Sequence, residues 1–289
     1  MSEKVLITGA TGLIGKEALL PLLERGFEVF ATSRNEINND SIRCLQGSLF
    51  DSAFVERVFN DVKPEYLLNF AWITGENYLL SSENYLFEKA GFELLKAFIR
   101  NGGKKAVYAG TCFEYKHENK ILTENSPLEP VSVYAKCKDS LRQKGEELAA
   151  QNGLDFVWGR IFYVLGHGEH KTRFLPALID ALKNNREFSL KTPNDKKDYM
   201  YSKDIAKAFV TLLESQITGC VNVCTGEGIS VYDLAMKAAI RLQKEHLIKV
   251  SENLENKEYS IVGDNTKLCS SGFVCDYTLD GAIENILAD

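Results

Sequence analysis

Two side chains near the middle of this 289-residue chain are spaced for proton transfer. Tyr134 and Lys138 stand four residues apart at the start of a predicted helix, so their side chains fall on one face. An ammonium stabilises a nearby phenolate, and Lys138 is therefore expected to lower the pKa of Tyr134 from its usual value of about 10. At a separation of about 4 Å and an effective dielectric of about 20, the attraction amounts to roughly 4 kcal/mol. The pair predicts a tyrosine that acts as a general acid or base.

A third polar group ends the apolar segment at residues 107–111, Val-Tyr-Ala-Gly-Thr. The segment has the composition of a buried strand, and Thr111 presents a hydroxyl at its carboxyl end. The carboxyl ends of parallel strands border the ligand crevice of an open α/β sheet. Thr111 therefore joins Tyr134 and Lys138 as a candidate catalytic residue.

The start of the chain has the spacing of a phosphate-binding loop. Residues 8–15, Thr-Gly-Ala-Thr-Gly-Leu-Ile-Gly, follow an apolar run and open a predicted helix. The glycines allow a tight turn and the close approach of backbone to a pyrophosphate, and the helix N-terminus favours negative charge. The segment predicts dinucleotide binding by Gly9, Thr11, Gly12, Leu13, Ile14 and Gly15.

The end of the second predicted strand bears on which dinucleotide is used. NAD enzymes usually carry an acidic residue there for the adenosine ribose, whereas this chain has Thr32, Ser33 and Arg34. A guanidinium can bind a 2′-phosphate through two parallel hydrogen bonds, and Ser33 could donate another. The segment favours NADP(H) and leaves NAD(H) possible.

An alternating α/β framework would bring these residues together. Apolar runs typical of buried parallel strands occur at residues 4–8, 28–32, 66–71, 105–109 and 155–160. Helical patterns lie between them at residues 13–25, 52–60, 82–101 and 134–151. The alternation predicts a doubly wound parallel sheet of Rossmann type, with helices on both faces.

The pattern changes after Gly166. Helices are predicted at about 172–184 and 203–214, separated by a polar Pro-Asn-Asp-Lys-Lys loop and followed by an amphipathic pair near the C-terminus. We expect a dinucleotide-binding domain at 1–165 and a smaller C-terminal substrate-binding lobe at 166–289, with residues of about 196–225 partly returning to the first domain. The chain has no Pro-rich linker, so the two parts should be packed together.

Composition restricts the partners. The net charge of −6 argues against a nucleic-acid-binding surface. No apolar run reaches the roughly 18 residues of a membrane span, and the chain enters its first strand without a signal peptide, so a cytoplasmic protein with no membrane contact is predicted. Seven cysteines without a Cys-x-x-Cys pair predict no disulfide framework, and His167 and His170 lack a third ligand, so no metal is expected.

Taken together, the glycine loop, the strand-end threonine and the Tyr-x-x-x-Lys pair resemble the extended short-chain dehydrogenase/reductase superfamily. This superfamily comprises nucleotide-sugar epimerases, dehydratases and reductases. Further segments similar to its motifs follow in the right order, at residues 69–72, 159–166, 197–204 and 222–226. The resemblance covers essentially the whole chain.

The resemblance implies a role for each catalytic candidate. Thr111 would hold the substrate oxygen, Tyr134 would carry the proton, and Lys138 would bind the nicotinamide ribose. Hydride would pass between the nicotinamide and a sugar carbon. Further cofactor contacts are expected from Ser48, Leu49 and Ala71.

The resemblance also implies a nucleotide-diphosphate sugar as substrate. Trp72 is expected to contact it, and Arg173 and Lys197 are candidates for its two phosphates. Three positions depart from the family pattern, because Tyr163 replaces an Asn, Ser48 replaces an adenine-side Asp, and Lys197 replaces an Arg.

The reaction is narrowed by the two residues after Thr111. A 4,6-dehydratase needs an Asp-Glu pair there, and Cys112 and Phe113 cannot do that acid and base work. A 4-epimerase and a 4-ketoreductase remain. Arg34 favours NADPH-dependent reduction of a nucleotide-linked 4-keto-(6-deoxy)sugar, because a reductase must exchange its cofactor with a mainly NADPH pool.

Two further expectations complete the prediction. A non-catalytic NADP-sensing regulator is a remote alternative, since such proteins commonly lose the catalytic tyrosine that is present here as Tyr134. A homodimer is expected, because the helices predicted at 82–101 and 134–151 could form an intersubunit four-helix bundle, as in relatives of this family.

Overall fold

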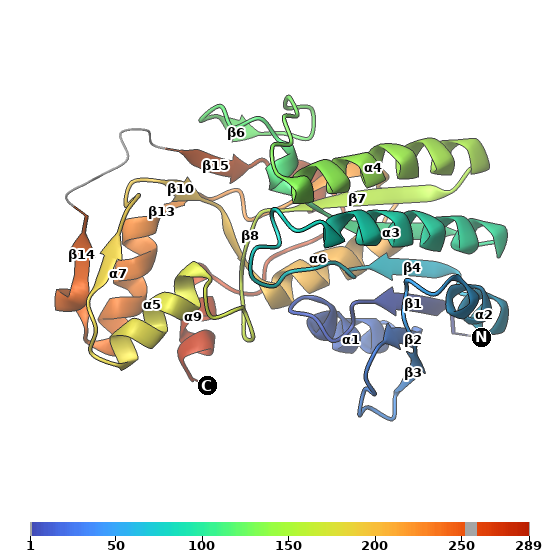
Figure 1. Cartoon of the computed structure of the whole chain (residues 1–289), viewed down its shortest axis with the longest axis horizontal. Coiled ribbons are helices and arrows are strands. Elements are labelled where there is room, and N and C mark those ends of the chain that lie inside the picture. The colour runs from blue at the N-terminus through green and yellow to red at the C-terminus, as the bar shows by residue number, and fades with distance from the viewer. Residues whose placement is uncertain (1, 252–258, 289) are drawn as a thin grey trace.

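A parallel sheet organises the first part of the chain in the computed structural model, which describes residues 2–251 and 259–288 (Figure 1). Within those residues the sheet has seven strands in the order β12-β7-β5-β4-β1-β2-β3. The strands are β1 (Lys4–Thr8), β2 (Glu28–Ser33), β3 (Ile42–Gln46), β4 (Tyr66–Asn69), β5 (Lys105–Thr111), β7 (Asp155–Ile161) and β12 (Gly219–Val223). Every pairing is parallel, which confirms the predicted Rossmann-type fold.

The two strands at the edges of the sheet, β3 and β12, are not among the five strands predicted from the sequence. β3 is only partly buried and mixes Ile42 with exposed Arg43 and Gln46, so it lacks the apolar run that identified the inner strands. β12 comes from the second half of the chain and pairs with β7. A strand buried on one face is less apolar than one buried on both, which explains why β3 was not predicted.

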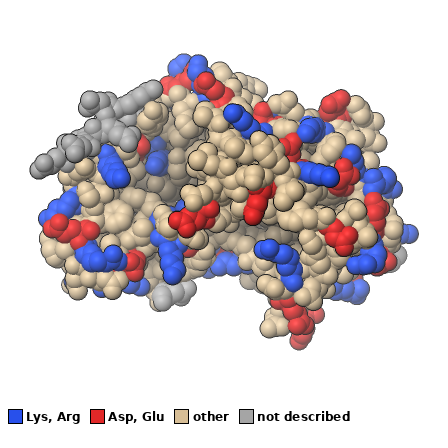
Figure 2. All heavy atoms as spheres, in the orientation of Figure 1, with Lys and Arg blue, Asp and Glu red and all other residues tan. Residues whose placement is uncertain are grey.

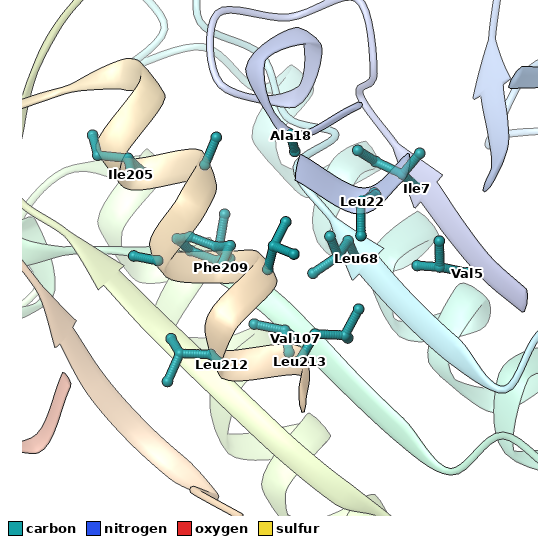
Figure 3. Close-up of a cluster of buried hydrophobic side chains, with 14 of the residues drawn as sticks. Val5, Ile7, Ala18, Leu22, Leu68, Val107, Ile205, Phe209, Leu212 and Leu213 are labelled. Atoms are coloured by element: carbon teal, nitrogen blue, oxygen red, sulfur yellow. The ribbon is translucent and has the colours of Figure 1, made fainter. Parts of the chain in front are cut away.

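Helices cover both faces of the sheet. α1 (Gly15–Glu24) and α6 (Ser202–Glu214) pack together on one face, where Val5, Leu22 and Phe209 lie in a single buried cluster (Figure 3). The opposite face is covered by α2 (Ser52–Val62), α3 (Glu83–Arg100) and α4 (Val133–Asn152). The sheet is therefore buried on both faces, as its apolar strands require.

The start of α4 is fixed by a capping residue. The Ser132 hydroxyl accepts a hydrogen bond from the Ala135 amide at 3.1 Å, and the helix ends at Gly153 with φ of +65°. Serine is a favoured N-cap because its oxygen satisfies an amide that has no partner within the helix. The cap places Tyr134 in the first turn.

The remaining elements build a smaller lobe beyond the carboxyl ends of β1 and β4 (Figure 1). Its helices α5 (Phe174–Lys183), α7 (Val231–Leu242) and α9 (Leu279–Ala288) share one apolar cluster. Its strands are β6 (Ile121–Leu122), β10 (Lys196–Lys197), β13 (Ile229–Ser230) and β15 (Ser260–Gly263) in one sheet, and β9 (Phe188–Leu190) with β14 (Ile248–Val250) in another. Short turns occur at η1 (Cys112–Glu114) and η2 (Glu245–Leu247).

Several segments cross the expected division at residue 165. β8 (Tyr163–Leu165) pairs with β11 (Tyr199–Tyr201). From the second half of the chain, α6 packs on the large sheet and β12 joins it by pairing with β7. In the other direction, β6 from the first half joins the smaller lobe by pairing with β15. α8 (Thr266–Cys269) returns to the large core through Leu268, so the two parts are interwoven rather than joined by one linker.

Charge is mixed over the face shown in Figure 2, where basic and acidic side chains alternate without a large patch of one sign. None of the helices in residues 2–251 and 259–288 is long and apolar enough to span a bilayer.

Candidate active site

The glycine loop has the shape of a phosphate cradle. Gly9 has φ of +68°, and a Cβ there would lie 2.8 Å from the Ala71 nitrogen. A Cβ on Gly15 would lie 2.1 Å from the Gly9 oxygen, so glycine is required at both positions. Thr11 and Gly12 are exposed at the N-terminus of α1. The loop fits a dinucleotide pyrophosphate, because backbone amides and the positive end of a helix face the same solvent-accessible turn.

The predicted adenosine end of the cofactor site lies at the end of β2. Arg34 is exposed, and its guanidinium makes no hydrogen bond or ion pair with the described residues. Its carbonyl accepts a hydrogen bond from the Gln46 side chain at 3.0 Å. The Ser33 hydroxyl accepts the Asn35 amide at 3.2 Å. The backbone is thus held from both sides while the guanidinium stays available for an anion.

The other predicted cofactor residues border the same edge of the sheet. Ser48 and Leu49 follow β3 and are half-buried, and the Ser48 hydroxyl accepts the Phe50 amide at 3.2 Å. Ala71 follows β4, and its amide donates to the Thr8 hydroxyl at 3.3 Å. These residues come from separate βα connections, which the parallel topology brings to one edge.

The three predicted catalytic residues lie together. Thr111 is the last residue of β5 and is buried, and its hydroxyl accepts the Phe113 amide at 3.3 Å. The side chains of Thr111 and Tyr134 are hydrogen-bonded to one another. The Thr111 hydroxyl can accept the Phe113 amide and still donate its own proton to a second partner.

Lys138 is buried one helical turn from Tyr134. Its Nζ donates to the Ala109 carbonyl at 2.6 Å and lies 3.8 Å from the centre of the Trp72 ring. Burial lowers the pKa of Lys138 from 10.5 to about 7, and the field of Glu114 opposes this shift. An ammonium with one carbonyl and one aromatic face as partners is poorly compensated for the water it has lost.

The prediction that Lys138 lowers the pKa of Tyr134 is wrong. Burial raises the pKa of Tyr134 above its usual value, the neighbouring Tyr78 raises it further, and the hydrogen bond with Thr111 only partly offsets both. The ammonium points at Ala109 and lies 5.9 Å from the Tyr134 ring, so desolvation of the phenolate outweighs its attraction. Tyr134 is therefore a neutral phenol at neutral pH.

Arg173 contacts Tyr134, the predicted catalytic tyrosine, through Tyr78. Its Nη1 donates to the Tyr78 hydroxyl at 3.3 Å, and its guanidinium stacks 4.5 Å from the centre of the Tyr78 ring. The Tyr78 and Tyr134 rings meet edge to face with centroids 4.9 Å apart. A cation of the smaller lobe, a tyrosine of the β4–α3 connection and the catalytic tyrosine thus form one contiguous row.

Lys197 approaches the same region from β10. Its Nζ lies 5.2 Å from the centre of the Tyr163 ring, and burial lowers its pKa while Asp195 and Cys112 raise it. Cys112 directly follows Thr111, so Lys197 lies on the catalytic side of the smaller lobe. Tyr163 and Phe113 meet edge to face at 6.0 Å and form an apolar wall there.

Trp72 lies against the catalytic pair. Its ring faces Lys138 and meets Tyr134 at 6.2 Å, and its Nε1 donates to the Asn84 side chain at 2.7 Å. Asn84 is fully buried and also donates to the Tyr78 carbonyl at 2.6 Å. Trp72 is thus held beside Lys138 and Tyr134.

Sequence reasoning missed a buried charged group beneath this site. Glu114 is fully buried and accepts hydrogen bonds from the Thr111 amide, the Trp158 indole and the Arg160 guanidinium. Its only signal in the sequence is a Glu three residues after a Thr, which is the spacing of a capping box. Nothing in the local sequence predicts its partners on β7, Trp158 and Arg160.

No cluster of three His, Cys, Asp or Glu side chains that could hold a metal occurs in the part of the chain the structure describes. The His170 ring nitrogen instead pairs with the Thr172 hydroxyl at 2.9 Å.

Comparison with known proteins gives one family match. The model of the NAD dependent epimerase/dehydratase family matches residues 5–224. A UDP-glucose 4-epimerase of Corynebacterium glutamicum is 28% identical over 79% of this chain and 77% of its own length. A GDP-6-deoxy-D-talose 4-dehydrogenase of Aggregatibacter actinomycetemcomitans is 27% identical over 80% of this chain and 77% of its own.

A similar fold occurs in a crystal structure of UDP-glucose 4-epimerase with UDP-glucose from Thermotoga maritima. The two structures superpose with a TM-score of 0.87 over 99% of this chain and 97% of the other, at 21% identity. At this identity the likeness concerns the fold.

Replacing Lys138 by Met should change how stability depends on pH. The folded-state pKa of about 7 lies below the unfolded value of 10.5, so between these values the unfolded chain binds more protons and wild-type stability rises with pH. Lys138→Met should therefore be more stable than wild type near pH 6, by at least about 1 kcal/mol, and this gain should shrink toward pH 10. Urea unfolding at several pH values measures both.

Lys136→Met provides the matched control, because Lys136 is exposed on the same helix. Its stability difference from wild type should not vary with pH in this range. Parallel curves for Lys138→Met and wild type would contradict the shifted pKa.

Proposed function

The chain belongs to the NAD dependent epimerase/dehydratase family, and from this premise we propose that it reduces a nucleotide-linked 4-keto-6-deoxy sugar with NADPH. The relatives place it among enzymes of nucleotide-sugar oxidation, reduction and epimerisation. The finer proposal concerns the direction of hydride transfer, the cofactor and the sugar.

Burial keeps Tyr134 in its protonated form, and this resting state supports the direction of the proposal. Reduction of a ketone needs a proton donor at the oxygen that becomes an alcohol, whereas the first step of an epimerase needs a base to remove that proton. A neutral phenol at the edge of the site can serve the first task, and general acid catalysis contributes roughly 10²- to 10⁴-fold.

Each residue then has one task in the reduction. A bound reduced nicotinamide supplies hydride to C4 of the sugar. Tyr134 donates its phenolic proton to the oxygen on C4, and the Thr111 hydroxyl holds that oxygen in line. Lys138 lies one turn further along α4, where its ammonium can bind ribose hydroxyls and help restore the proton of Tyr134.

The smaller lobe supports a nucleotide diphosphate carrying a 6-deoxy sugar. Arg173 and Lys197 supply the two cations that a diphosphate requires. The Phe113 and Tyr163 rings offer an apolar surface two residues from Thr111, which suits a methyl group at C6. The relative named as a 6-deoxy-talose 4-dehydrogenase supports the same substrate class.

The alternative is a 4-epimerase, favoured by the relatives that carry that name. In an epimerase, the same residues would remove hydride and proton from a sugar alcohol and return them to the other face. The cofactor would be regenerated in every turnover, so the two functions differ in net consumption of NADPH.

The reductase should consume one NADPH per product and transfer label from deuterated NADPH to C4. Tyr134→Phe should lower turnover by about 100-fold or more and leave NADPH affinity unchanged within about twofold, because only the proton donor is lost. Absorbance at 340 nm and mass spectrometry of the sugar measure these effects. Interconversion of UDP-hexoses without loss of NADPH would show an epimerase instead.

Arg34 should select NADPH over NADH. We infer this from its free guanidinium at the end of β2, although the family name refers to NAD. Arg34→Asp should weaken NADPH binding by about 2 kcal/mol, roughly 30-fold, and spare NADH, because a charge-assisted contact is replaced by repulsion. Arg43→Asp, an exposed arginine on β3, is the control and should keep the wild-type preference. Equal calorimetric affinities of wild type for both cofactors would contradict the assignment.

A homodimer is proposed through α3 and α4. Most apolar side chains of α3 face the sheet, but Leu80, Tyr85, Leu86 and Val131 are exposed near the starts of these two helices. Light scattering should give twice the chain mass of 32.4 kDa, and Leu86→Glu should shift the population toward monomer. Ile240→Glu, an exposed apolar site on α7, should not. A monomeric wild type at micromolar concentration would overturn the proposal.

A further inference from the structure

A buried carboxylate lies directly behind the catalytic threonine. One oxygen of Glu114, Oε1, accepts the Thr111 amide at 3.0 Å and the Trp158 Nε1 at 2.9 Å. The other, Oε2, accepts the Arg160 Nε at 2.7 Å. In return, the Thr111 hydroxyl accepts the Phe113 amide within the same turn. Every one of these groups is fixed by a partner that is itself buried or part of the backbone.

The ion pair is not explained by stability. Glu114 and Arg160 are both almost completely buried, and an ion pair in such surroundings often stabilises a fold no more than apolar residues of the same size. The Nη1 of Arg160 donates to the Tyr115 hydroxyl at 2.9 Å and to the Glu124 carbonyl at 3.2 Å. The buried Glu114 carboxylate accepts the backbone amide of Thr111. This contact points to a role in positioning Thr111.

We propose that Glu114 is a positioning residue, whose carboxylate fixes the Thr111 backbone so that the Thr111 hydroxyl stays aligned with Tyr134 and the substrate oxygen. This inference rests on the proposed function for its reaction, but its structural basis is independent of the substrate. The capping box makes this link direct. The Thr111 hydroxyl accepts the Phe113 amide, and the Glu114 carboxylate accepts the Thr111 amide at the start of the same turn.

The charge of Glu114 has a second effect on the same site. The negative charge of Glu114 raises the pKa of Lys138 and so opposes the effect of burial there. Lys138 is otherwise surrounded by Trp72, Trp158 and the Ala109 carbonyl, which carry no net charge. The two double variants that test the proposal both lack this charge, so a difference between them reports the hydrogen bond to Thr111 and not the field at Lys138.

Two double variants separate the acceptor from the ion pair. Glu114→Gln with Arg160→Met keeps an oxygen for the Thr111 amide, whereas Glu114→Leu with Arg160→Met removes it. Both lose the same ion pair and leave no cation unpaired. The Leu variant should lose about 100-fold in kcat, the scale of a small misplacement at a reacting group, with NADPH affinity unchanged within about twofold. The Gln variant should stay within about threefold of wild type. Equal kcat values for the two variants overturn the proposal.

Glu114→Asp keeps the comparison decisive if the Leu variant does not fold. Asp retains the charge for Arg160 but is one methylene shorter, so it cannot reach both Arg160 and the Thr111 amide. Its kcat should fall well below that of the Gln variant. If the Asp variant, which keeps the charge, is more active than the Gln variant, which keeps the side-chain length, the proposal is overturned. Tyr115→Phe is the control for damage to the network, because it removes the hydroxyl that accepts from Arg160 and donates to Asn222 but leaves Thr111 untouched.

Hydrogen exchange of the Thr111 amide tests the positioning role without a substrate, and so separates it from the proposed reaction. The amide should exchange faster in the Leu variant than in the Gln variant, whatever the substrate is. If wild type reduces none of the keto-sugars but the exchange rates differ in this way, the proposed reaction fails and the positioning role stands. If wild type is active and the exchange rates are equal, the positioning role fails alone.

Discussion

Burial of charge at the carboxyl end of β5 is the constraint on which the rest of the site depends. Lys138, Glu114 and Arg160 lie between the large sheet and α4, out of contact with water. Each needs a partner, because an unpaired charge in such surroundings is strongly unfavourable. Glu114 pairs with Arg160 and accepts the Thr111 amide, whereas Lys138 has the Ala109 carbonyl and the Trp72 ring. The geometry of the candidate site thus reflects how each desolvated charge is compensated.

The same burial sets the acid and base character of the site. Desolvation lowers the pKa of Lys138 to about 7 and raises that of Tyr134, so each group shifts toward its neutral form. In the folded chain the Tyr134 phenol is therefore protonated at neutral pH. Tyr78 strengthens this tendency and connects it to the smaller lobe through Arg173. A ligand that moves Arg173 would therefore also change the surroundings of the catalytic tyrosine.

The smaller lobe and the large sheet share several strands and helices rather than one hinge. β6 leaves the first half to pair with β15, and α8 returns to pack on β12. Asp198 between them accepts hydrogen bonds from the Thr225 and Gly226 amides and holds the chain after β12. Arg173 precedes α5 of the smaller lobe and contacts Tyr78 of the β4–α3 connection, so one candidate substrate cation connects the two parts.

The sequence by itself determined the local features: the glycine loop, the Tyr134–Lys138 spacing, the inner strands and hence the Rossmann-type fold. Turn geometry and the helical repeat act over a few residues, so local sequence is sufficient for them. Only the tertiary structure decided the position of β3, the direction of the Tyr134 pKa shift and the partners of Glu114. These depend on desolvation and on contacts such as Glu114 with Arg160, 46 residues apart. No local pattern records how much water a folded chain removes from a charged group.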